Sequence, residues 1–186
     1  MTPPNWRDED GIPLLQKTGA TFIGIFELAL HCGANGIEKV SGMNKGGSQK
    51  VEGVEFRMVH AVHSAGTSGA GSETNFPSDP CGYVLTFEDG FRIYFAGDTN
   101  VFADMALIGE LYEPDLAMLP IGDFFTMGAL EAAKAVELLG VKRVLGMHYG
   151  TFDALVGTPQ ALRDELGKRG LSDVVVEELA PGDTLE

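Results

Sequence analysis

Cysteine and long apolar runs are both scarce in this chain. Cys32 and Cys81 are the only cysteines, and no C-x-x-C pair occurs, which argues against a disulfide framework or a zinc knuckle. We expect two buried thiols in a reducing cytoplasm. The apolar stretch 21–30 is interrupted by Gly24 and Glu27 and is too short to span a bilayer. We therefore predict a cytoplasmic protein with no membrane partner.

Basic residues are also few. Lys and Arg together number 13 against 27 acidic residues, which gives a formal net charge of −14. Such a surface repels phosphate backbones, and no Lys/Arg cluster offsets it, so we expect no nucleic-acid partner. A local basic pocket for one small anion stays open. Residues 1–10 are acidic and contain no apolar segment, which argues against a signal peptide.

Common catalytic and phosphate-binding motifs are absent. No G-x-S-x-G occurs, so there is no nucleophile elbow, and no G-x-x-x-x-G-K-[ST] occurs. The stretch 66–80 is rich in Gly, Ser and Thr, but no helix start follows its glycines. We interpret it as a flexible or functional loop rather than a phosphate cradle.

What is present fits one α/β domain over residues 1–186. Hydrophobic residues make up 44% of the chain and charged residues 22%, as in ordinary globular proteins. Hairpins come first and β-α-β units follow, which indicates a layered α/β sandwich. The expected strands are 20–25, 49–51, 54–62, 83–87, 91–96, 116–119, 143–147 and 174–178, and the expected helices are 12–17, 26–32, 102–112, 130–139 and one that begins at Thr158–Pro159.

Three polar residues follow apolar strands. Asp98 comes after the strand 91–96 through Gly97, while His148 and His63 each end another strand. Each has a structural alternative: Asp98 could start a turn or cap a helix, and either histidine could be a half-buried, hydrogen-bonded residue. Because strand ends are where α/β folds build their sites, the set together favours one metal site.

Two further histidines are set aside. His60 lies three positions before His63, so in an extended strand it points to the opposite face. His31 lies beside Cys32 in a predicted helix and is interpreted as structural.

Five short motifs carry a family resemblance. The chain resembles the metallo-β-lactamase superfamily, and within it a branch of uncharacterised bacterial and archaeal metal-dependent hydrolases similar to ascorbate-phosphate lactonases. The resemblance implies an αββα sandwich with a dinuclear metal site. The motifs, in chain order, are Ala61-Val62-His63-Ser64, Ala96-Gly97-Asp98-Thr99, Leu119-Pro120-Ile121-Gly122, Phe125-Thr126-Met127-Gly128 and Met147-His148-Tyr149.

The same resemblance implies roles for three residues. His63 would bind the first metal, Asp98 would bridge both metals and His148 would bind the second, with Asp98 and His148 as the catalytic residues. The intact site would hold two divalent metals, zinc in the first place, with manganese, iron or nickel as alternatives. A metal-bound hydroxide would attack a small ester, lactone or phosphoester, and Phe125–Gly128 would line the pocket mouth.

One family motif is missing from the printed sequence. No His-x-His-x-Asp-His occurs, and residues 3–10 stand where the resemblance places it. Asp8 or Asp10 could substitute as ligands. The resemblance therefore predicts an N-terminally incomplete sandwich that lacks its opening strands, with impaired activity. The alternative is a metal-free remnant that acts as a binding or assembly module, and its uncovered sheet would favour a homo-oligomer.

Overall fold

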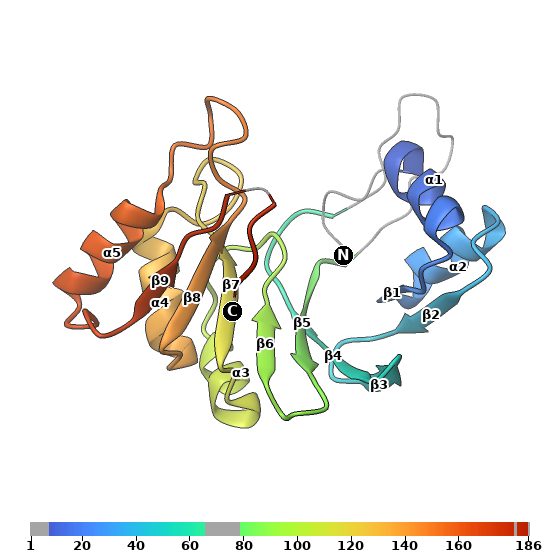
Figure 1. Ribbon diagram of the computed structural model, residues 1–186, viewed down its shortest axis with the longest axis horizontal. Coiled ribbons are helices and arrows are strands. Elements are labelled where there is room, and N and C mark those ends of the chain that lie inside the picture. Colours follow the sequence, from blue (N-terminus) through green and yellow to red (C-terminus); the bar gives the residue numbers. More distant parts are fainter. Residues whose placement is uncertain (1–7, 66–78, 181, 186) are drawn as a thin grey trace.

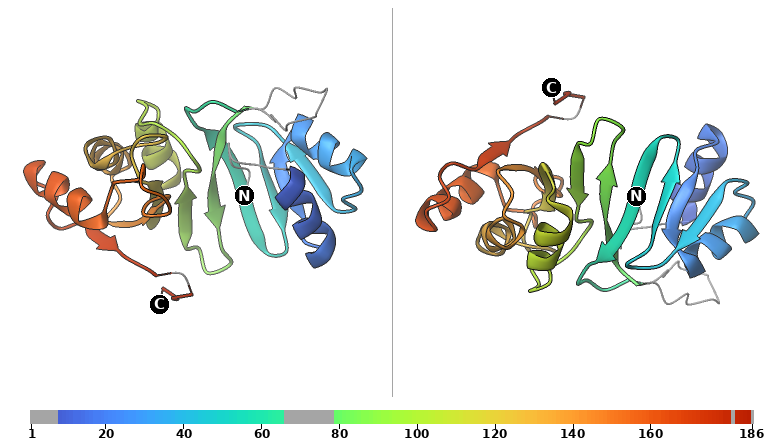
Figure 2. Two further views of the ribbon diagram at one scale, coloured as in Figure 1. Left: turned by 90° about the horizontal axis from the view of Figure 1, so that it is seen from above. Right: turned by 90° about the horizontal axis from the view of Figure 1, so that it is seen from below.

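The computed structural model describes residues 8–65, 79–180 and 182–185. Two sheets organise them (Figure 1). A mixed seven-stranded sheet has the order β3-β4-β5-β6-β7-β8-β9, and β1 and β2 form a separate parallel pair. Helices α4 and α5 lie at one end of the molecule beside β7–β9, and α1 and α2 lie at the opposite end with β1 and β2 (Figure 2).

The N-terminal layer consists of α1 (Asp8–Thr18), β1 (Phe22–Ile25), α2 (Phe26–Ala34) and β2 (Val40–Met43). Helix α1 ends at Gly19, whose φ of 63° suits a residue without a Cβ. The apolar side of this layer packs on the large sheet in a core cluster of its own. That cluster includes Phe22, Ile25, Leu28, Cys32, Met58 and Tyr83.

The antiparallel half of the large sheet runs through β3 (Ser48–Val51), β4 (Val54–His60), β5 (Cys81–Thr86) and β6 (Arg92–Phe95). Glu52 and Gly53 form the first hairpin turn, and both have positive φ values, of 49° and 88°. This two-residue connection with both φ angles positive matches the twist of the strands that it joins.

The parallel half adds β7 (Leu116–Pro120), β8 (Arg143–Met147) and β9 (Val175–Glu177) to β6. The crossovers are α3 (Met105–Tyr112), α4 (Ala129–Leu139) and α5 (Pro159–Lys168). Parallel strands end at one edge of a sheet, so the segments that follow β6, β7 and β8 meet there.

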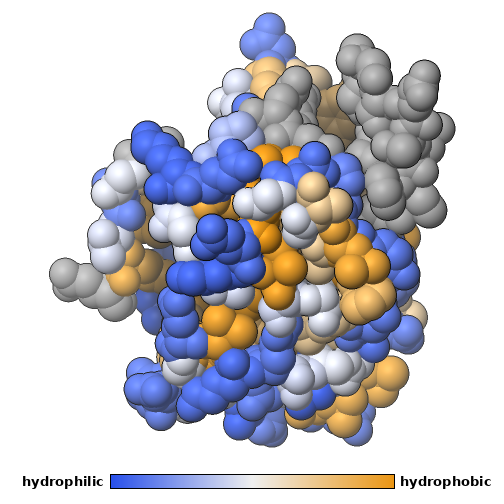
Figure 3. All heavy atoms as spheres, turned by 90° about the vertical axis from the view of Figure 1, so that its right-hand side faces the viewer, coloured by the Kyte–Doolittle hydropathy of each residue, from blue (hydrophilic) through white to orange (hydrophobic). Residues whose placement is uncertain are grey.

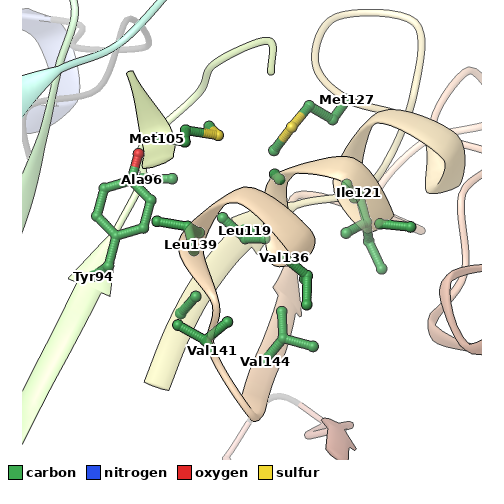
Figure 4. Packing of buried hydrophobic residues seen from close by; sticks show 14 of the residues in the cluster. Tyr94, Ala96, Met105, Leu119, Ile121, Met127, Val136, Leu139, Val141 and Val144 are labelled. Atoms are coloured by element: carbon green, nitrogen blue, oxygen red, sulfur yellow. The ribbon is translucent and has the colours of Figure 1, made fainter. Parts of the chain in front are cut away.

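The larger core cluster fills the space between this parallel half and its helices (Figure 4). Val136 and Leu139 of α4 lie over Leu119 and Val144 of the sheet, and all four are at most 4% exposed. Apolar side chains at i and i+3 share one helix face, which explains why this stripe is buried. The core thereby fixes the sheet edge on which the candidate site lies.

The α/β sandwich expected from the sequence is confirmed, and each strand and helix predicted there is present with ends shifted by a few residues. Strand β2 was not predicted. Both cysteines are buried and form no disulfide among the described residues. Within the described residues, no helix is long and apolar enough to cross a membrane. The predicted loop 66–80 falls mostly outside the described residues, as does the side chain of Asp8, and Asp10 is exposed.

Some apolar surface is left open to solvent. A cavity of about 270 Å³ lies between the β1 layer and the face of β4–β6, lined by Thr21, Ile23, Phe56, Tyr83, Leu85 and Phe95. The end of the molecule that carries α1 and α2 shows apolar areas between polar ones (Figure 3). Exposed apolar side chains of this layer include Leu14, Phe26, Leu30 and Val40.

Candidate metal centre

Asp98 is held at the end of β6 by a tight turn. Gly97 has a φ of 65°, and a Cβ there would lie 3.0 Å from the Cys81 carbonyl oxygen, so the turn suits glycine. Asp98 is 7% exposed and Thr99 is fully buried, and they are the buried polar residues of the described chain. A buried carboxylate needs a compensating charge or hydrogen bonds, which makes this turn a place for chemistry.

His148 follows β8 and has an unusual backbone conformation. Its φ is 54°, a region that few residues other than glycine adopt. Its carbonyl oxygen packs against Gly122, where a Cβ would come within 2.0 Å of that oxygen. The segment that follows β7 therefore fixes the direction in which the chain leaves β8. Backbone strain of this kind is often kept at functional sites.

The two side chains meet at the shared edge of the sheet. His148 Nε2 lies 3.5 Å from an Asp98 carboxylate oxygen, and both side chains are mostly buried. This distance is long for a hydrogen bond. Two ligand atoms on one tetrahedral zinc ion, each about 2.0–2.1 Å from the metal, are about 3.3 Å apart. The pair therefore has the spacing of two ligands of one cation.

The other ring nitrogen of His148 is buried without a partner. Nδ1 makes no hydrogen bond with the described residues. Nothing described therefore fixes the ring proton on either nitrogen, and the tautomer with the proton on Nδ1 has its electron pair on Nε2, where a cation would bind. The donor set, one imidazole and one carboxylate, suits zinc and related divalent ions. Asp98 and His148 thus fit a cation in chemistry and in spacing.

His63 takes a different position. Its Nδ1 lies 2.7 Å from the Ser64 carbonyl oxygen, and its Nε2 lies 3.0 Å from that of Phe125. A neutral imidazole donates from one nitrogen only, so the neutral ring satisfies one of these contacts. Among residues 8–65, 79–180 and 182–185, no three His, Cys, Asp or Glu side chains form a metal-binding group. The structure brings Asp98 and His148 together, and the three-residue ligand set stays a prediction.

The segment 121–128 contacts both His63 and His148. The Phe125 carbonyl oxygen lies 3.0 Å from His63 Nε2, and Gly122 packs against the His148 carbonyl oxygen. Asp123 and Phe124 have φ values of 66° and 55°, and the Asp123 carboxylate accepts a hydrogen bond from the Phe124 amide at 2.7 Å. Two successive left-handed residues are costly in free energy, which marks this loop as one whose shape is set by its role.

Apolar side chains gather on this loop and on its neighbour, 149–157. The Gly157 amide donates to the Gly122 carbonyl oxygen at 3.2 Å, so the two loops lie in contact. Phe124 and Phe125 form an edge-to-face pair with ring centres 4.6 Å apart. Both are more than half exposed, and so are Phe152 and Val156. We call these four residues the apolar rim.

Tyr149 stands next to His148 in sequence. Burial raises the pKa of its phenol above the usual value, and the Glu178 carboxylate adds to this effect while Arg163 opposes it. The phenol is therefore neutral at neutral pH. It adds no negative charge beside His148.

Two features of the site were missed from sequence alone. Phe152 and Val156 lie in a loop that no motif marked. Thr99 directly follows Asp98, but nothing in the sequence shows that its hydroxyl reaches the segment before His63. The resemblance implied that Phe125–Gly128 line the pocket mouth, and this stays a prediction; the structure places the Phe125 carbonyl oxygen 3.0 Å from His63 Nε2.

Comparison with known proteins relates the chain to one superfamily. A family model described as the beta-lactamase superfamily domain matches residues 17–149. The chain is similar to the UPF0173 metal-dependent hydrolase of Rubrobacter xylanophilus, with 44% identity over 176 residues, covering 95% of this chain and 72% of the relative. The corresponding protein of Methanopyrus kandleri is 46% identical over 177 residues, covering 95% and 76%.

A solved structure shows the same fold. Igni18, a metallo hydrolase from the archaeon Ignicoccus hospitalis, superposes with a TM-score of 0.80 at 33% identity, covering 95% of this chain and 72% of Igni18. A metal-dependent hydrolase structure from Parabacteroides distasonis gives 0.60 at 26% identity, covering 88% and 66%. With its strand-end carboxylate and histidine in a sandwich of this kind, the chain belongs to the UPF0173 metal-dependent hydrolases of the metallo-β-lactamase superfamily.

Proposed function

We propose that this chain hydrolyses a small ester, lactone or phosphoester at a divalent cation held by Asp98 and His148, with His63 as a further ligand. The 3.5 Å spacing of Asp98 and His148 carries the proposal. When bound, the cation supplies Lewis-acid activation of water and of the scissile group. Zinc is the first candidate, and the same nitrogen and oxygen donors also accept manganese, iron or nickel.

The chain's own residues supply position and a dry environment. The Gly97 turn and the left-handed backbone at His148 hold the two donor atoms at a fixed separation. Asp98 is buried, so its charge acts in a medium of low dielectric constant, where electrostatic effects on a reacting group are larger than in water. A site fixed in this way needs little rearrangement when the substrate reacts.

The apolar rim favours a neutral ester or lactone among the three substrate classes. Loops 121–128 and 149–157 contain no Lys or Arg and contribute Asp123 and Asp153. A phosphate dianion would meet no basic side chain from these loops and would approach a chain of net charge −14. Exposed aromatic side chains instead bind the apolar part of an acyl or leaving group.

The proposal is tested by comparing substrates of matched leaving group. Para-nitrophenyl butyrate and para-nitrophenyl phosphate would be offered to the chain after EDTA treatment and after addition of Zn²⁺ or Mn²⁺. We expect metal-dependent release of nitrophenol from the butyrate, lost in Asp98→Asn, and little release from the phosphate. Equal rates in Asp98→Asn and the unaltered chain would overturn the proposed site, and faster phosphate hydrolysis would overturn the preference.

A second candidate function is assembly through the open apolar surface. The cavity of about 270 Å³ on the face of β4–β6 favours it, because apolar hollows of this kind accept a partner's side chains. Light scattering of the purified chain discriminates between the two functions. A stable homo-oligomer with neither bound metal nor hydrolytic activity would support assembly, whereas a metal-binding monomer that hydrolyses the butyrate would exclude it.

A further inference from the structure

Thr99 makes two hydrogen bonds from a fully buried position beside Asp98. Its hydroxyl oxygen accepts from the Val62 amide at 2.9 Å and donates to the Asn100 carbonyl oxygen at 2.7 Å. A third bond runs from the Asn100 amide to the Val62 carbonyl oxygen at 2.8 Å. Both main-chain polar groups of Val62 are therefore bound to the turn that carries Asp98.

These bonds connect two segments that are not neighbours in the sheet. Strand β5 lies between β4 and β6, so β4 and β6 run parallel to each other without pairing. Strand β5 begins at Cys81, so it does not separate the two segments that follow β4 and β6. These two segments contact each other directly there. The contact is thus an added bridge, made only at the edge of the sheet where Asp98 and His148 meet.

The hydrogen bonds of this bridge follow the pattern of a parallel β-ladder, except that one main-chain acceptor is replaced by a side-chain hydroxyl. In such a ladder, a residue opposite Thr99 would donate to the Asp98 carbonyl oxygen and accept from the Asn100 amide. Val62 makes the second bond, but its amide donates to the Thr99 hydroxyl. A side chain thus replaces a main-chain carbonyl, and Val62 lies opposite Thr99, one residue before His63.

We propose that Thr99 is a positioning residue for the metal centre, an inference that rests on the proposed function. By accepting the hydrogen bond from the Val62 amide, its hydroxyl holds the backbone just before His63 beside the Asp98 turn, as two paired strands are held. In this proposal the His63 ring turns away from the Phe125 carbonyl oxygen and toward the cation of Asp98 and His148 when the cation binds. Without the hydroxyl, the Val62 amide loses its partner, and only the bond from the Asn100 amide to the Val62 carbonyl oxygen is left to hold this separation.

The test compares Thr99→Val with Thr99→Ser by calorimetric titration with Zn²⁺. Valine keeps the shape and removes the hydroxyl, whereas serine keeps the hydroxyl and leaves a small void. We expect Thr99→Val to bind Zn²⁺ about tenfold more weakly, as is usual when a residue that orients a ligand is lost. Thr99→Ser should bind as the unaltered chain does, even where its thermal stability is lower. Amide exchange of Val62 should accelerate in the valine variant alone.

A matched control and a second pair make the outcome decisive. Tyr83→Phe also removes one hydroxyl, which donates to the Ile23 carbonyl oxygen at 3.1 Å in the other core cluster, and should leave Zn²⁺ affinity unchanged. If Thr99→Val does not fold, Thr99→Ala against Thr99→Ser gives the same comparison. Equal Zn²⁺ affinity with and without the hydroxyl would overturn the role of Thr99. Absence of Zn²⁺ binding in the unaltered chain would instead overturn the proposed function.

Discussion

At His148 the backbone and the side chain are coupled through Gly122. The histidine keeps a φ of 54° because its carbonyl oxygen occupies the space that a side chain at position 122 would fill. The direction of the imidazole toward Asp98 therefore depends on a residue that carries no functional group. Glycine at a site of close backbone approach is a common way to hold a strained residue.

Gly122→Ala should displace this carbonyl and lower the free energy of unfolding by about 3 kcal/mol, the upper end of the usual cost of overpacking. Gly150→Ala serves as a control for backbone strain alone, because Gly150 has a φ of 66°, which Gly122 does not share, and open space where its Cβ would lie. Left-handed strain alone costs about 1–2 kcal/mol. Urea unfolding of both variants checks the difference, and equal losses would contradict the packing account of His148.

Tyr94 gives a prediction for alkaline pH. It is fully buried, its hydroxyl has no hydrogen-bond partner among the described residues, and burial raises its pKa well above the usual range. In the unfolded chain the phenol ionises at about pH 10, the usual value for tyrosine, so above that pH ionisation favours unfolding and stability falls as pH rises. Figure 4 shows the hydroxyl directed toward Met105 and Ala96.

Tyr94→Phe should therefore lose less stability than the unaltered chain above pH 10. It should also raise the free energy of unfolding at neutral pH by about 1 kcal/mol, because the variant no longer buries an unpaired hydroxyl. Urea unfolding at pH 7 and at several values above pH 10 measures both effects. Tyr112→Phe serves as the control, since it keeps the ring that lies 5.3 Å from the Arg57 guanidinium carbon. A Tyr94→Phe variant that is destabilised at pH 7 would show that the hydroxyl has an unseen partner.

At the scale of the elements, helix α5 begins with a side-chain cap. Thr158 accepts a hydrogen bond from the Ala161 amide at 3.1 Å, and Pro159 occupies the first turn. Thr158→Ala should lower the free energy of unfolding by about 1 kcal/mol, while Thr158→Asp should retain the cap and most of the stability. Thermal unfolding of the pair checks this prediction. An aspartate variant as unstable as the alanine variant would mean that the cap contributes little.

Elements with a strong local signal were predictable from the sequence, and those that depend on distant contacts were not. The cap at Thr158, the Asp89-Gly90 turn between β5 and β6, and the apolar stripe of α4 are local signals, and each predicts its element without distant contacts. Strand β2 carries Gly42 in its middle, which weakens a strand pattern. The structure explains the glycine, because a Cβ there would lie 3.0–3.1 Å from Phe26 on the preceding helix.

The candidate site shows the same division. Asp98 and His148, together with His63, were predicted to share a site because each follows an apolar strand. The structure brings Asp98 and His148 together because β6, β7 and β8 are parallel and end at one edge of the sheet. The direction of the His63 ring toward the Phe125 carbonyl oxygen could not be predicted, since it depends on a loop whose shape is set by two left-handed residues. The Thr99 bridge likewise could not be predicted, because the spacing of residues along the chain does not show that the segments after β4 and β6 contact each other.

Considered as a whole molecule, the protein has one well-packed half and one more open half. The core around α4 and the parallel strands holds the sheet edge at which Asp98 and His148 meet. The β1 layer leaves an apolar cavity against β4–β6. The chain belongs to a family of metal-dependent hydrolases, and the donor atoms of Asp98 and His148 that we propose as its metal centre lie in the packed half.

The most direct measurement is a titration of the chain with Co²⁺, followed by its visible absorption, in parallel with His148→Ala and His31→Ala. Co²⁺ reports nitrogen and oxygen ligands at sites that also accept zinc. We expect a saturable absorption change in the unaltered chain and in His31→Ala, since His31 lies on α2 away from the site, and its loss in His148→Ala. A change that is absent from the unaltered chain, or that persists in His148→Ala, would contradict the assignment of Asp98 and His148 as a metal centre.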